Sequence, residues 1–132
     1  MQGIPGVILD PTAENEEDGE QWDFENPDKI KQAIETVKEK RAILIICNPM
    51  VHLLKQCKTM EDLADPEVIN SMKRNVELCA QLCAIQHNQG MYFMYEHMWE
   101  ARSWNHPLIR QLRERERRSG MHKRRRVCIH NW

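Results

Sequence analysis

Hydrophobic positions along the chain alternate between helical spacing and short unbroken runs. A first helix is predicted to begin at Asn26-Pro27, because Asn caps helices and Pro suits the first helical position. Its apolar residues at positions 30, 33, 34 and 37 fall on one helical face. A second helix is predicted from an Asp65 N-cap to about Asn88, and a third opens at Pro107 and stops before Gly120.

Three apolar or aromatic runs between and after these helices predict strands at residues 42–47, 91–96 and 126–130. The first run, AILIIC, is typical of a strand buried on both faces, as in a parallel sheet. Alternating helices and strands predict an α/β fold. We therefore expect a Rossmann-like three-layer sandwich, with a partial parallel sheet of about three strands and long crossover helices.

Composition and length narrow the class of protein. The 132 residues are 41% hydrophobic and 30% charged, which suits one globular domain. We expect residues 1–25 to be an acidic N-terminal loop or arm and residues 26–132 to be a single partial α/β domain. No apolar run approaches the length of a membrane span, and no secretory signal is recognisable. Five Cys without framework spacing favour an intracellular location, cytoplasmic or nuclear, and no membrane partner.

Charge is distributed unevenly despite a formal net charge of −1. Residues 1–28 hold nine acids and no Lys or Arg, whereas residues 108–132 hold nine Lys or Arg and two acids. There are two interpretations. In the first, both ends are solvated surfaces. In the second, the basic end is a patch that binds DNA or RNA. The residues of such a patch are Arg113, Arg117, Arg118, Lys123, Arg124, Arg125 and Arg126, and Trp99 and Trp104 either stack on a base or hold their loop against the sheet.

Polar residues follow the first two predicted strands. Asn48 and Pro49 come after the first, and Glu96 ends the second. Parallel strands end at the same edge of a sheet, so these residues are expected to share one cleft. Cys79, Cys83 and His87 lie on one helical face, where metal binding is an alternative to core packing. We expect core packing and no metal. Cys57 with His97 as a nucleophilic pair has no specific support.

Several segments resemble a known family. They are Asp10-Pro11-Thr12, the acidic loop up to Trp22-Asp23-Phe24, the run ILIICNPM and the run YFMYEHMWEARSW. From Gly6 to about His130 the chain resembles a methyltransferase-related region of mobile-element polyproteins. It is similar to the part of cytosine-5 DNA methyltransferases that spans their Pro-Cys loop and their Glu-Asn-Val strand end. The resemblance implies that Glu96, Asn48 and Pro49 are the remnant of a site that holds a flipped-out base.

The departures from that family determine the expected function. The catalytic thiol would stand at position 51, where this chain has Val51, so no nucleophile is available there. Asn48-Pro49-Met50 also lacks the second Pro and the aromatic residue of an amino-methyltransferase loop. The five Gly form no GxG turn, so we expect no cofactor in isolation, and S-adenosylmethionine only if a partner completes the fold.

Three functions therefore remain open. The first is a degenerate methyltransferase-like domain without independent catalysis, which associates with nucleic acid through its basic C-terminal segment. The second is an active S-adenosylmethionine-dependent DNA methyltransferase module that another chain completes. The third is a protein-interaction module with no nucleic-acid role. A small sheet leaves apolar surface incompletely covered, so a homodimer or a partner chain is also expected.

Overall fold

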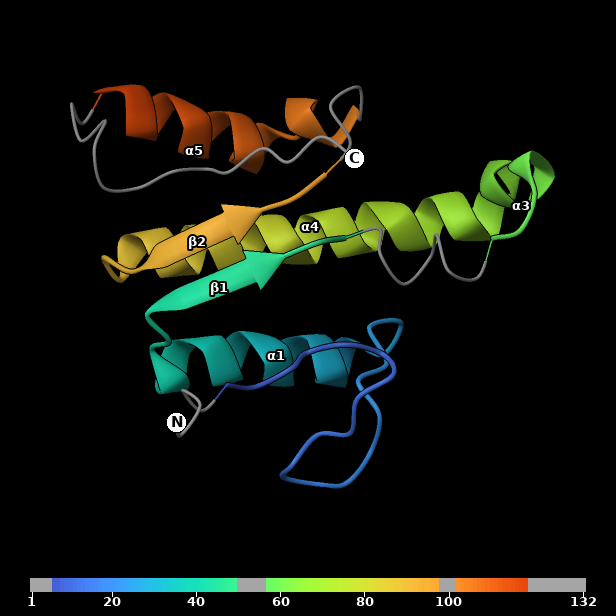
Figure 1. The fold of residues 1–132 in the computed structure, drawn as a ribbon, viewed down its shortest axis with the longest axis horizontal. Helices are drawn as coiled ribbons and strands as arrows, with labels where there is room; N and C mark the ends of the chain where they lie inside the picture. Colours follow the sequence, from blue (N-terminus) through green and yellow to red (C-terminus); the bar gives the residue numbers. More distant parts are fainter. Residues whose placement is uncertain (1–5, 50–56, 98–101, 119–132) are drawn as a thin grey trace, which may run out of the picture.

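A computed structural model describes residues 6–49, 57–97 and 102–118, without the side chains of Glu116 and Arg117. Four α-helices, two strands and a 3₁₀-helix follow one another along this part of the chain (Figure 1). In order they are α1 (Pro27–Lys40), β1 (Leu44–Cys47), α3 (Met60–Ala64), α4 (Pro66–Asn88), β2 (Tyr92–Tyr95), η1 (Arg102–Asn105) and α5 (Pro107–Arg118).

The ends of the long helices are determined by local capping. The Asn26 side chain accepts a hydrogen bond of 2.9 Å from the Asp28 amide at the start of α1. Asp65 accepts one of 2.8 Å from the Glu67 amide at the start of α4. Gly90 follows the C-cap of α4 with a φ of 76°, which a glycine adopts without strain. These observations confirm the predicted helix starts and the predicted end of α4.

The two strands form a parallel pair with Leu44 opposite Tyr92 and Cys47 opposite Tyr95. α4 makes the long return between them and lies behind the sheet in Figure 1, so that the connection is right-handed. The β1–α4–β2 unit confirms the predicted alternation of strand and helix in a parallel sheet. The predicted third strand, residues 126–130, lies outside the described residues.

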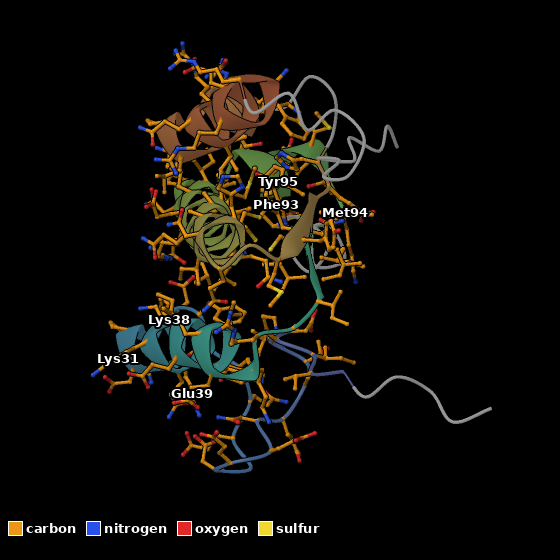
Figure 2. The ribbon with its side chains drawn as sticks, turned by 90° about the vertical axis from the view of Figure 1, so that its left-hand side faces the viewer. Lys31, Lys38, Glu39, Phe93, Met94 and Tyr95 are labelled. Carbon is orange, nitrogen blue, oxygen red and sulfur yellow. The ribbon has the colours of Figure 1, made fainter. Side chains whose placement is uncertain are left out.

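Among the described residues, helices cover one face of this sheet. Phe93 and Tyr95 are buried against α4, whereas Met94 lies on the opposite side of the strand (Figure 2). On that opposite face Leu44 is 46% exposed and Ile46 is 61% exposed. The prediction that residues 42–47 are buried on both faces is therefore wrong for this part of the chain. The described residues show a two-strand parallel sheet with helices on one side, and the finer three-layer arrangement is not seen among them.

The acidic N-terminal segment packs on α1 rather than standing away from it. Its chain turns at Gly19, and Glu14 pairs with Gln21 in an antiparallel bridge. Lys29 of α1 is only 4% exposed and donates hydrogen bonds of 2.6 Å to Asp18 and 3.0 Å to Glu20. A buried ammonium group needs such partners. The hydrogen bond with Lys29 lowers the pKa of Asp18, and the same bond raises the pKa of Lys29.

One helix and one turn were not predicted from the pattern of apolar residues. α3 lies within the connection predicted over residues 48–64, and η1 lies within the loop predicted over residues 97–106. α3 begins with a capping box. The Thr59 side chain accepts a hydrogen bond from the Asp62 amide, and the Asp62 side chain accepts one from the Thr59 amide. The Thr-x-x-Asp spacing of the capping box is visible in the sequence. A helix this short has no apolar stripe, however, so the pattern of apolar residues did not predict it.

Two glutamines of α4 tie its end to the segment that leads from α1 into β1. Gln86 is fully buried and donates a 2.5 Å hydrogen bond to the Ala42 carbonyl. Gln89 donates one of 3.2 Å to the Lys38 carbonyl. Between these two carbonyls Arg41 caps α1 with a φ of 45°, in the left-handed region. The chain reversal into β1 therefore depends on a non-glycine residue in a conformation that favours glycine.

Replacing Arg41 by glycine should stabilise the fold. Arg41→Gly removes the steric cost of a Cβ at positive φ and should raise the free energy of unfolding by about 1 kcal/mol. Urea denaturation followed by circular dichroism measures the change. Arg41→Ala is the control, because it removes the same side chain but keeps the Cβ, and it should show no comparable gain. Equal stabilisation by both variants would contradict the backbone explanation.

Candidate site at the strand ends

The polar residues that follow β1 and β2 lie at the same edge of the sheet. The Glu96 amide donates a 2.9 Å hydrogen bond to the Cys47 carbonyl, so the parallel pairing extends to the residues after each strand. Asn48 and Glu96 are half-buried there. Pro49 is buried, and its carbonyl accepts a 3.3 Å hydrogen bond from the Asn75 side chain of α4. The structure thus brings Asn48 and Glu96 to one edge, and Val51 lies outside the described residues.

A hollow of about 240 Å³ lies away from this edge, between the N-terminal segment and α1. Its wall includes Asn15 and Trp22 of the segment and Thr36 of α1, and it contains no residue of β1, β2 or their ends. The shared cleft around Asn48 and Glu96 therefore stays a prediction.

Beyond β2 the chain forms a buried polar and aromatic cluster. Nδ1 of His97 hydrogen-bonds with Oγ of Ser103 on η1, and the ring centroids of Tyr95 and Trp104 lie 5.2 Å apart in an edge-to-face arrangement. His97 is 5% exposed, and within the described residues Nε2 of its ring and the Tyr95 hydroxyl have no hydrogen-bond partner. Burial lowers the pKa of His97, which keeps the ring neutral, and burial raises the pKa of Tyr95.

This cluster changes the interpretation of two sequence candidates. Trp104 is 8% exposed and packs in the core, so its ring holds the loop against the sheet and is not free to stack on a base. His97 contacts Ser103, and the described contacts do not join it to Cys57. The Ser103 contact was not predicted, because a spacing of six positions gives no periodic signal. Trp99 lies outside the described residues.

Three cysteines converge in the core from β1 and α4. Cys47 and Cys83 are buried, Cys79 packs against them, and all three are free thiols. The hydrogen bond with Cys47, and after it burial, raises the pKa of Cys79 and of Cys83, which favours the protonated thiol at both positions. Core packing of Cys79 and Cys83 agrees with the sequence prediction. Within the residues that the structure describes, no group of three His, Cys, Asp or Glu side chains is arranged to hold a metal ion.

The basic residues divide between α5 and the segment beyond it. Ile109 and Leu112 of α5 are buried, whereas Arg110, Arg115 and Arg118 are exposed and Arg113 is half-buried. The side chain of Arg117 and residues 123–126 are outside what the structure describes. In the described ranges no helix is both long and apolar enough to cross a bilayer.

Comparison of the chain with protein-family models, with curated proteins and with solved structures found no match.

Protonation of His97 should destabilise the fold at mildly acidic pH. The unfolded state binds a proton near pH 6.5 and the folded state only at lower pH, so the free energy of unfolding should fall as pH decreases below 6.5. Chemical denaturation over a pH series measures this slope. His97→Gln should flatten it.

The matched control is His106→Gln, which removes an imidazole that lies beside Glu77 and leaves His97 in place. This variant should keep the acid-dependent loss that His97 causes. An unchanged slope in His97→Gln would show that the buried ring does not resist protonation.

Proposed function

We propose that this chain is a methyltransferase-like remnant without catalysis of its own, and that it binds nucleic acid through α5 and the basic residues that follow it. The observation that carries the proposal is the division of α5 into two surfaces. Ile109 and Leu112 fix the helix to the core, and the exposed arginines are held outward by that anchoring. A helix held in this way presents positive charge at fixed positions, which is what contact with a phosphate backbone requires.

The positive charge of α5 and of residues 123–126 supports nucleic-acid binding by this part of the chain. α5 contains five Arg and two Glu, and residues 123–126 add one Lys and three Arg. Phosphate binding by such residues releases counterions, which makes affinity strongly salt-dependent. Trp104 takes no part in the proposed contact because it is buried. The contact is therefore with the backbone, and we expect little discrimination between sequences.

The catalytic side of the proposal rests on residue chemistry. Glu96 and Asn48 lie at one sheet edge, where a carboxyl and an amide suit hydrogen bonds to a base. Val51 offers no thiolate for the covalent attack that cytosine-5 methylation needs. The described βα connection carries no glycine-rich turn to approach a nucleotide cofactor. An acid without its nucleophile and cofactor supports binding rather than catalysis.

Binding to duplex DNA should weaken steeply with salt, and the slope should depend on α5. Reversing three exposed arginines, as R110E/R115E/R118E, should reduce the slope of log K against log salt by about 2 to 3, because each phosphate contact contributes about 0.9. R124E/R125E/R126E should have the same effect. Fluorescence anisotropy at several salt concentrations measures both.

The control reverses three exposed lysines of α1, as K31E/K38E/K40E. Lys31 and Lys38 are labelled in Figure 2. The change in net charge of this control equals that of the α5 variant, so a general charge effect would lower both slopes alike. A site on α5 leaves the slope of the α1 variant at the wild-type value. Equal loss in the two variants would contradict the proposed site.

An active module completed by another chain is the second candidate, and the position of Asn48 and Glu96 after paired strands supports it. The two candidates differ in cofactor binding. Titration calorimetry of the full chain with S-adenosylmethionine should give no heat of binding if the chain is a remnant. Micromolar binding would instead favour the active module and would contradict the proposed loss of the cofactor site.

A further inference from the structure

Two hydrogen bonds define the register in which β1 lies along α4. Before the strand, the Gln86 side chain donates a 2.5 Å hydrogen bond to the Ala42 carbonyl. After the strand, the Asn75 side chain donates one of 3.3 Å to the Pro49 carbonyl. β1 and α4 are in contact and therefore run in opposite directions along one another, as Figure 1 shows.

This register places Cys79 opposite Cys47. Cys47 lies two residues before Pro49 on the strand, and Cys79 lies four residues after Asn75 on the helix. Two residues of strand and four residues of helix each advance the chain by about 6 to 7 Å, so both cysteines are equally far from the hydrogen bond between Asn75 and Pro49. Cys83 lies on the same face of α4, about 6 Å further along the helix.

The contacts of the three thiols agree with this register. Cys47 hydrogen-bonds with Cys79 and with Cys83, and all three thiols are free. Cys47 and Cys83 are buried, whereas Cys79 is half-buried, so solvent reaches the cluster at Cys79. The hydrogen bonds from Cys79 and, after it, Cys83 lower the pKa of Cys47, which favours the thiolate at that position. Cys47 is therefore the strongest nucleophile of the three.

We propose that Cys47 and Cys79 form a reversible disulfide when the protein meets hydrogen peroxide, and that this bridge ties the end of β1 to α4. The Cys47 sulfur attacks one peroxide oxygen, the O–O bond breaks, and the other oxygen leaves as water with the thiol proton. The Cys79 sulfur then attacks the sulfenic acid on Cys47, the S–O bond breaks, and the hydroxyl leaves as water with the Cys79 proton. Two thiols and one hydrogen peroxide thus give one disulfide and two waters.

Cys79 is the partner because of its position along α4. A disulfide requires the two Cα atoms to lie within about 4.4 to 6.8 Å of each other. Cys79 stands at the point of the helix opposite Cys47, whereas Cys83 is displaced from that point by a full turn, about 6 Å. Cys79 is also the member of the cluster that solvent reaches.

The bridge acts on the sheet edge that carries the candidate site. Asn48 follows Cys47 directly, and the Glu96 amide donates its hydrogen bond to the Cys47 carbonyl. A covalent link between residues 47 and 79 limits how far β1 separates from α4. The end of β1 therefore opens less often in the oxidised protein than in the reduced protein.

The first test oxidises the full chain with hydrogen peroxide and measures its mass. C57S/C128S is the parent, because these changes prevent bridges outside the three core cysteines. The oxidised chain should lose the mass of two hydrogen atoms, and dithiothreitol should restore it. Tandem mass spectrometry of the unreduced peptides should join Cys47 to Cys79. A bridge from Cys47 to Cys83 in this parent, or oxidation of Cys47 to the sulfinic acid without a bridge, would overturn the proposal.

Two variants of that parent test the choice of partner. Cys79→Ala should abolish the bridge. Cys83→Ala is the matched control, because it removes a thiol that also hydrogen-bonds with Cys47 and lies one turn away on the same face, and it should still form the bridge. Circular dichroism verifies that both are folded, and the peptide analysis of the parent decides the matter if either is not. Loss of the bridge in Cys83→Ala alone would contradict the assignment.

The second test follows amide hydrogen exchange by nuclear magnetic resonance in the reduced and the oxidised protein. The Glu96 amide should exchange about tenfold more slowly after oxidation, because its partner carbonyl belongs to the bridged Cys47. The Ile30 amide is the internal control, since it bonds to the Asn26 carbonyl in the first turn of α1 and exchanges by local fraying of that turn. It should exchange at the same rate in both forms. Equal exchange of the Glu96 amide in the two forms would show that the bridge does not tie the end of β1.

Discussion

The fold depends on the burial of one sheet face against α4. Two strands of four residues each are too short to be stable as a sheet in water, and their parallel pairing requires a long return connection. α4 is that connection, and it also contacts α1, α3, α5 and both strands. Its apolar side chains Leu78, Leu82 and Cys83 form the centre of the core. α1, α3, α5 and both strands are therefore positioned by what they pack against on this helix, and η1 packs on α5.

Buried polar side chains determine how the remaining segments join this unit. Gln86 bonds to the carbonyl of Ala42, Lys29 holds the acidic segment, and His97 bonds to Ser103. Each joins segments that apolar packing alone would leave in several registers, because a buried polar group without its partner is costly. The chain paths before β1 and after β2 are specified in this way. The edge that carries Asn48 and Glu96 is consequently well defined.

The sequence predicted the features whose causes are local. Asn26-Pro27 and Asp65-Pro66 mark helix starts by themselves, and the alternation of helix and strand gave the parallel pairing. Residues 42–47 were misjudged because an unbroken apolar run looks the same in the sequence whether one face of the strand is covered or both are. The Lys29 ion pairs and the His97–Ser103 contact escaped prediction because they depend on tertiary placement. Trp104 had two equal interpretations until its burial was known.

α5 combines an anchored face with an exposed basic surface. At 3.6 residues per turn, Arg115 lies about 140° around the axis from Arg110, so the exposed arginines cover a broad arc. Ile109 and Leu112 are buried on the remaining face and fix that arc relative to the core. Duplex nucleic acid has regularly spaced phosphates, so charges held at fixed positions on one rigid helix suit contact with its backbone.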